Sequence, residues 1–94
     1  MNEQDFERQL KADGFTEIEH QKLDPRPGKG RHRHLFEIRG LVLSGKFVVK
    51  QTGEPVVYQA GEIFSVAHGE LHDEWIEDGG AQILVGRKFS EVRS

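Results

Sequence analysis

The residues of this 94-residue chain best suited to chemistry are its histidines, and three of them fall in an informative pattern. His32 and His34 are two positions apart, and residues at that spacing share one face of an extended strand but diverge on a helix. His72 lies in a second β-rich run, after a turn over residues 67–71. Three imidazoles from two strands can hold one metal ion and leave positions on it open for water or substrate.

Two carboxylates are candidates for roles beside these imidazoles. The chain has no cysteine, so any metal ligand must come from His, Asp or Glu. Glu74 has the same strand parity as His72 and is predicted to point into the same interior, as a ligand or as a proton-transferring group. Glu37, three positions after His34, is the second candidate, as a ligand or as the group that moves a proton.

The N-terminal residues 2–15 are predicted to form a short amphipathic helix. Phe6 and Leu10 lie at i,i+4, and Asn2 is a suitable N-cap. Gly14 fits the C′ position, which would place Phe15 against Leu10 in a Schellman ending. We therefore expect a helix that packs as a lid on whatever follows.

After residue 15 the pattern changes to short β-rich runs separated by glycine, proline and polar turns, which favours a sandwich or barrel. The turn-rich segment 24–30 should break any ladder, residues 51–54 should close one hairpin, and residues 77–80 should close another. Closing the sheet would remove its exposed edges. The expected strands cover residues 16–23, 34–43, 46–50, 56–59, 62–66, 72–77 and 82–88.

Composition narrows the possible partners and location. Sixteen acidic against thirteen basic residues give a formal charge of −3, so we expect no nucleic-acid partner. No apolar run is long enough for a membrane helix, and the acidic start differs from a secretion signal. Together with the absence of cysteine, these features lead us to expect a cytoplasmic protein without membrane contact.

The histidine spacing resembles the two motifs of the cupin family, G-x5-HxH-x3,4-E-x6-G and G-x5-PxG-x2-H-x3-N. The first motif is matched at His32, His34 and Gly45, and the second at Gly61, Gly69 and His72. The departures are Arg26 for the opening glycine, Ala67 for the proline and Ile76 for the asparagine. The motif spacing puts Ile38 at the glutamate position, one residue after Glu37, so the resemblance implies a site of three histidines alone unless a β-bulge resets the strand and lets Glu37 ligate. The chain is therefore similar to small single-domain, metal-binding cupins.

This resemblance implies a fold, a cofactor and a range of functions. The fold would be an all-β double-stranded β-helix (a jelly-roll barrel) with a short N-terminal helix: one domain over residues 1–94, with residues 1–15 as helical cap and 16–94 as barrel. One divalent ion (Fe, Mn, Ni or Zn) would be bound by His32, His34, His72 and possible ligand Glu37, with Glu74 as the catalytic group. The protein would be a homodimeric oxygenase, isomerase or decarboxylase acting on a small oxygenated substrate. The alternative is a non-catalytic module that binds or senses a small ligand.

Overall fold

The chain begins with a helix whose two ends are set by local sequence. The computed structural model describes residues 1–90, and α1 spans Glu3–Ala12. Asn2 caps it, because its Oδ1 accepts a hydrogen bond from the backbone N–H of Asp5 at 2.8 Å. At the other end Gly14 has φ of +87°, and the N–H of Phe15 donates to the carbonyl of Leu10 at 2.9 Å. This is the Schellman ending that the sequence predicts.

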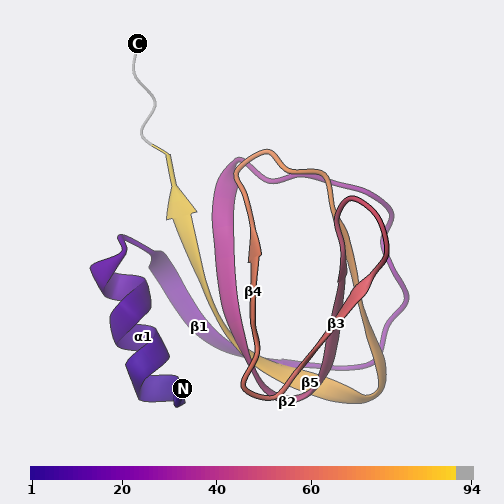
Figure 1. The fold of residues 1–94 in the computed structure, drawn as a ribbon, viewed down its shortest axis with the longest axis horizontal. Helices are drawn as coiled ribbons and strands as arrows, with labels where there is room; N and C mark the ends of the chain where they lie inside the picture. Colours follow the sequence, from indigo (N-terminus) through magenta and orange to yellow (C-terminus); the bar gives the residue numbers. More distant parts are fainter. Residues whose placement is uncertain (91–94) are drawn as a thin grey trace.

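Five strands follow within residues 1–90, and all their pairings are antiparallel (Figure 1). The main path of the sheet runs β1-β5-β2-β3, and β4 pairs with the first part of β2. Strands β2 and β5 are long enough to curve round the barrel. The second part of β2 pairs with β3, and the second part of β5 pairs with β1. The strands are β1 (Thr16–Leu23), β2 (Phe36–Lys50), β3 (Val56–Gln59), β4 (Ile63–Val66) and β5 (Asp73–Phe89).

The predicted hairpin at residues 77–80 is wrong. Strand β5 runs through this segment, and both of its halves pair with β2: Val48 lies opposite Trp75, and Gly40 opposite Val85. The predicted strands 34–43 and 46–50 likewise merge into β2, which has register shifts between Val42 and Phe47. The predicted hairpin turn at 51–54, in contrast, does connect two paired strands, β2 and β3.

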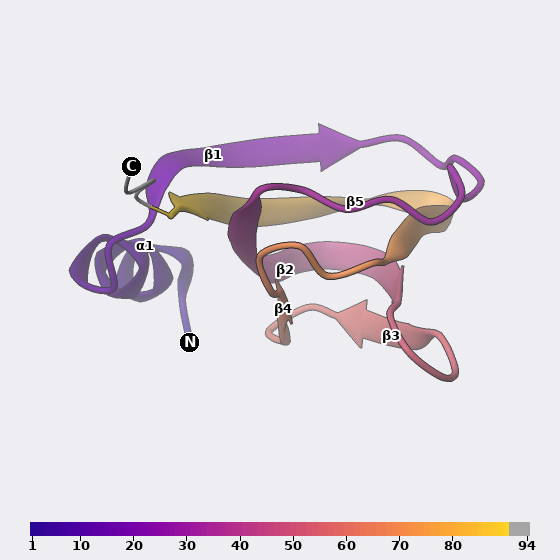
Figure 2. The same ribbon diagram turned by 90° about the horizontal axis from the view of Figure 1, so that it is seen from above.

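Residues alternate along the long strands between two apolar clusters. One cluster lines the barrel interior, and its members come from β2, β4 and β5: Val42, Phe47, Val49, Phe64, Val66, Ile76, Ala81, Ile83 and Val85. The other lies on the opposite face of β2 and β5, where α1 covers it (Figure 2), and contains Phe6, Leu10, Phe15, Leu41 and Leu84. The helix is therefore a lid on the outer face, and the barrel interior remains available for a site.

Two expectations from the sequence remain predictions at this level. No helix among residues 1–90 is long and apolar enough to cross a membrane. The cytoplasmic location and the single domain over 1–94 stay predictions, and residues 91–94 of the expected barrel lie outside the described residues.

Candidate metal centre

The three predicted histidines lie together just before the start of β5. His32 and His72 form an antiparallel bridge in which each backbone N–H donates to the other's carbonyl at 2.9 Å. His34 comes next on the same extended segment, and its ring centroid lies 5.1 Å from that of His32 and 5.3 Å from that of His72. One nitrogen from each ring lies within 4.8 Å of the other two. The rings are therefore close enough to converge on one ion.

Backbone carbonyls orient two of the imidazoles. Nδ1 of His32 lies 2.9 Å from the carbonyl oxygen of Gly30, and Nδ1 of His72 lies 3.1 Å from that of Glu70. A carbonyl can only accept, so in the neutral imidazole each Nδ1 carries the proton and each Nε2 keeps its lone pair for another partner. Metal-bound histidines are commonly held in this way by a second hydrogen bond.

The buried nitrogen of His72 tests whether these residues fit a metal. His72 is the buried polar residue of the described chain, at 0% exposure, and its Nε2 has no hydrogen-bond partner within residues 1–90. Leaving such an atom unpaired costs about 1–3 kcal/mol, so native proteins usually satisfy it. An ion bound jointly with His32 and His34 would supply the missing partner. The donor set therefore fits a divalent metal that accepts nitrogen ligands.

His34 is electrostatically suited to remain neutral. Partial burial, followed by the neighbouring His72 and His32 rings, lowers the pKa of His34 below its ordinary value. Its ring also stacks on Phe36, with centroids 4.8 Å apart and planes 14° from parallel. The neutral imidazole is the form that binds a metal, so the environment favours the ligating form of this residue.

A hydrogen-bonded turn over residues 67–70 supports the imidazoles. The sequence prediction missed the two side chains that hold this turn, Glu70 and Gln51. Oε1 of Glu70 accepts from the backbone N–H of Ala67 at 2.9 Å and from Nε2 of Gln51 at 3.2 Å. The same turn donates the N–H of Gly69 to the carbonyl of His34 at 2.9 Å. The side chain of Glu70 thus fixes the turn, and the backbone carbonyl of the same residue orients His72. The sequence signal that could have identified Glu70 was its position three residues after Ala67, where a side-chain oxygen can close a turn.

A cavity of about 300 Å³ opens inside the barrel beside the histidines, and His34 is part of its wall. Its apolar wall comes from alternating positions on β2 and β5 together with Phe64 of β4. Polar and charged side chains gather in the same cavity, namely Gln21, Arg26, Lys29, Glu74 and Arg87. A small molecule in this cavity would therefore lie against both an apolar surface and His34.

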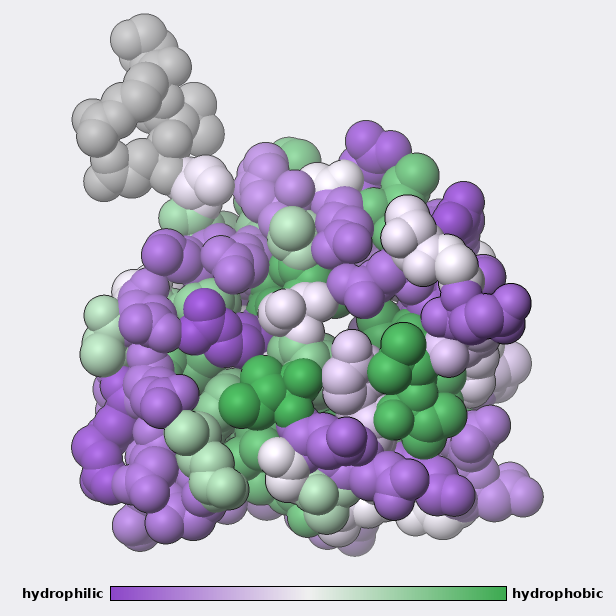
Figure 3. All heavy atoms as spheres, in the orientation of Figure 1, coloured by the Kyte–Doolittle hydropathy of each residue, from purple (hydrophilic) through white to green (hydrophobic). Residues whose placement is uncertain are grey.

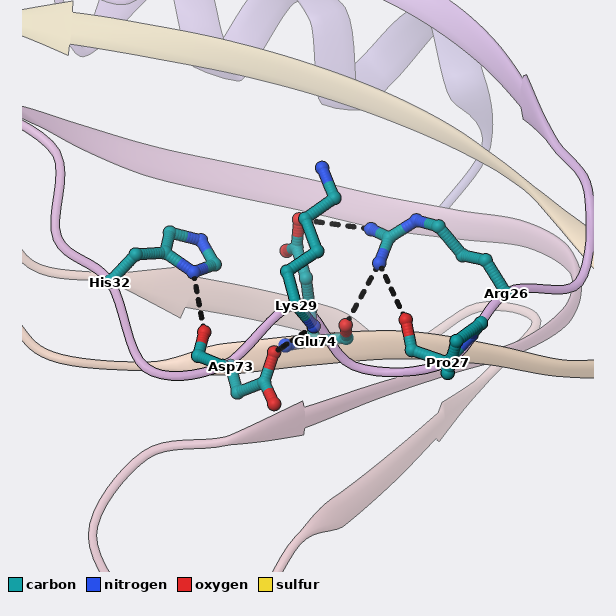
Figure 4. A network of polar contacts seen from close by, with 7 residues as sticks. Arg26, Pro27, Lys29, His32, Asp73 and Glu74 are labelled. Atoms are coloured by element: carbon teal, nitrogen blue, oxygen red, sulfur yellow. Dashed lines mark hydrogen bonds and ion pairs between the residues drawn. The ribbon is translucent and has the colours of Figure 1, made fainter.

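Glu74 lies where strand parity predicts, in the wall of this cavity. Figure 4 shows that its carboxylate faces Arg26, whose Nη2 lies 3.3 Å from Oε1. Arg26 also donates to the backbone carbonyls of Glu74 at 3.0 Å and Pro27 at 3.4 Å. The structure thus brings Glu74 to the cavity but not into the group of possible ligands, which contains the three histidines.

Glu37 is not brought to the imidazoles. Strand β2 keeps a regular register with β5 from Phe36 to Val42, so no bulge resets it before Glu37. Glu37 therefore alternates with Ile38, and Ile38 lines the cavity, as the spacing of the motif indicates. Because side chains alternate along a strand, Glu37 lies on the opposite face of β2 from Ile38 and the cavity.

Asp73 fastens the loop between β1 and β2 to the start of β5, beside the site (Figure 4). Its Oδ1 accepts from the backbone N–H groups of Glu74 at 2.8 Å and Lys29 at 3.0 Å. Partial burial tends to raise the pKa of this carboxyl, but the backbone donors outweigh that effect and lower it. The loop that carries Gly30, the carbonyl partner of His32, is thereby held against the start of β5, next to His72.

Comparison with known proteins identifies the architecture. No protein-family model and no curated protein matches the sequence. A solved structure of a Rhizobium leguminosarum protein of unknown function superposes with a TM-score of 0.69, covering 78% of this chain and 69% of its own at 22% identity. A cupin-2 domain protein from Shewanella frigidimarina gives a TM-score of 0.63, covering 81% and 69% at 18% identity.

A third similar structure carries the name of an activity. It is a predicted oxalate decarboxylase from Thermotoga maritima, with a TM-score of 0.64, covering 88% of this chain and 74% of its own at 22% identity. At these identities the likeness concerns the fold. Together with the antiparallel strands described above, it shows that the chain has the fold of the cupin superfamily, an all-β double-stranded β-helix with one short helix.

Proposed function

We propose that this protein is a small metal-dependent cupin enzyme that binds one divalent ion through His32, His34 and His72. The observation that carries the proposal is the buried, unpaired Nε2 of His72, which lies beside two further imidazoles. The identity of the ion, among Fe, Mn, Ni and Zn, depends on geometry and supply. Glu37 is outside this proposed shell because it lies on the other face of β2.

The residues around the proposed centre suit a reaction on a small oxygenated substrate. A bound ion held by His32, His34 and His72 would supply Lewis-acid or redox chemistry. The cavity would exclude water and orient the substrate against His34, while Glu74, the proposed catalytic group, would transfer a proton in the same space. Arg26 holds the carboxylate of Glu74 in place. Oxygenation, isomerisation and decarboxylation are all compatible with such a site.

One observation supports the alternative of a binding or sensory module. Arg26 occupies the carboxylate of Glu74 with an ion pair, and an acid or base must be free to exchange its proton. In this alternative the cavity would hold its ligand without converting it.

Turnover assays on reconstituted protein would decide between the two functions. Chelator-treated protein is loaded with Fe(II), Mn(II), Ni(II) or Zn(II) and incubated in air with a panel of small hydroxy- and oxo-carboxylates, and products are followed by mass spectrometry. The enzyme proposal predicts a product in at least one metal form and none with His72→Ala. Saturable thermal shifts without product in any metal form would instead identify a binding module.

We also propose that the protein is a homodimer. Strand β3 is at an edge of the sheet, and Val56, Val57 and neighbouring Ile63 of β4 are 42–46% exposed. In Figure 3 hydrophobic surface gathers over these two strands. Light scattering should give twice the chain mass of 10.7 kDa, and Val57→Lys should reduce it to the monomer value. A monomer at all concentrations would refute the dimer.

A further inference from the structure

We infer that the barrel cavity binds a small monocarboxylate with an apolar body, and that Arg87 receives its carboxylate. This inference names a substrate class for the proposed metalloenzyme, and in that sense it rests on the proposed function. The binding step itself can be measured without a metal.

The cavity wall requires a largely apolar ligand. Five of its residues, Ile38, Phe47, Phe64, Ile83 and Val85, come from the strands around it. Four of them are at most 5% exposed and belong to the packed core, namely Phe47, Phe64, Ile83 and Val85. A volume of about 300 Å³ lies at the lower end of ligand sites, so the ligand must be small. Contact with this wall favours a hydrocarbon or aromatic body over a fully polar one.

The charges in the cavity favour an anion. Arg26, Lys29 and Arg87 line it together with a single carboxylate, Glu74. Three cations against one anion leave an excess of positive charge before any metal is bound. A cationic ligand is therefore disfavoured, and a ligand with one carboxylate is attracted.

Among these cations, Arg26 is engaged within the protein, and of Lys29 and Arg87 only Arg87 has the planar fork that binds a carboxylate through two bonds. The guanidinium of Arg26 is already bound to Glu74 and to the carbonyl of Pro27. Arg87 has one ion pair within residues 1–90, with Glu19 at 3.5 Å, and the Glu19 side chain is 50% exposed. Such an exposed pair contributes little and can give way to a better-placed carboxylate.

Arg87 also lies at the right place relative to the candidate metal centre. It alternates with Ile83 and Val85 along β5, so its side chain is on the cavity side. Its guanidinium carbon is 5.8 Å from the centroid of the Phe36 ring, which in turn stacks on His34. A carboxylate bound by the planar fork of Arg87 would thus leave the rest of a small ligand between the apolar wall and His34.

Binding of matched ligands to chelator-treated, metal-free protein tests this inference. Phenylacetate has the charge and the apolar body, phenylacetamide lacks the charge, and oxalate lacks the apolar body. Calorimetric and NMR titrations should show saturable phenylacetate binding with methyl shifts at Ile38 and Ile83. The amide and oxalate should each bind roughly tenfold or more weakly, the amide because it cannot form the charge-assisted bond.

The variant Arg87→Gln should weaken phenylacetate binding roughly tenfold or more and leave phenylacetamide binding unchanged. Arg8→Gln is the matched control, because it removes the same charge from an exposed position on α1. Equal wild-type affinities for acid and amide would overturn the inference even if Arg87→Gln failed to fold. Unchanged phenylacetate binding by a folded Arg87→Gln, no phenylacetate binding at all, or shifts confined to other methyl groups would do the same.

The same preparations separate this inference from the proposed function. Metal uptake without a preference for the acid would refute the ligand class and leave the metal centre intact. Preference for the acid in a protein that takes up no metal would refute the metal centre and leave the anion site intact.

Discussion

Replacing Glu70 by alanine should loosen the proposed metal centre, although Glu70 does not belong to it. The substitution removes the oxygen that accepts from Ala67 at 2.9 Å and from Gln51 at 3.2 Å. Hydrogen bonds to a charged acceptor contribute about 1.5–3 kcal/mol each, less at a partly exposed site, so unfolding should become easier by roughly 2 kcal/mol. The carbonyl that orients His72 would lose its fixed position, and metal affinity should fall roughly 10-fold or more.

Competition titrations with a chromophoric chelator and thermal denaturation would measure both effects. Glu70→Gln should retain most of the affinity, because its side-chain carbonyl can accept the same two bonds. Glu54→Ala, at an exposed position in the turn between β2 and β3, is the control for the loss of a carboxylate. If Glu70→Ala lost stability but bound metal as tightly as the wild type, the positioning role would be refuted.

Three further predictions concern the groups around the centre. Glu74→Gln should keep its metal, measured by elemental analysis, while product formation falls roughly 100-fold, the usual effect of losing an acid or base; undiminished turnover would exclude Glu74 as the proton-transferring group. Glu37→Gln should keep both metal and turnover, because Glu37 lies on the face of β2 that points away from the cavity. Loss of metal in this variant would show that Glu37 is a ligand. For metal-free protein, the pKa of His34 lies below its ordinary 6.5, so the unfolded state holds more protons between these two values. The free energy of unfolding should therefore decrease as pH falls from 6.5 through that window and be insensitive to this group at higher pH; His34→Gln should flatten the dependence in urea titrations, and an unchanged slope would contradict the assigned cause.

The elements with strong local signals were predictable from sequence. Asn2 and Gly14 fix the ends of α1 through hydrogen bonds within a few residues, so their positions alone identify the helix. The glycines where the barrel strands bend led to the wrong prediction of a hairpin at residues 77–80. Gly45 lies so close to Gly80 that an added Cβ would be 2.1 Å from the carbonyl oxygen of Gly80. These glycines allow two curved strands to approach each other, and nothing local distinguishes that from a reversing turn.

The site was predictable to the extent that it follows strand parity. His32, His34 and His72 come together as their spacing indicates, and Glu74 reaches the cavity by the same rule. The role of Glu37 depended on whether a bulge precedes it, which is decided by the pairing of β2 with β5 far along the chain. The supporting contact between Gln51 and Glu70 joins a hairpin turn to a distant turn, so it required the folded structure.

The metal content of untagged protein, measured by elemental mass spectrometry, tests the central proposal most directly. A folded variant that carries both His32→Ala and His72→Ala serves as the control. We predict about one equivalent of Fe, Mn, Ni or Zn in the wild type, as purified or after reconstitution, and none in the variant. No metal in either protein after reconstitution, or equal metal in both, would contradict the three-histidine centre.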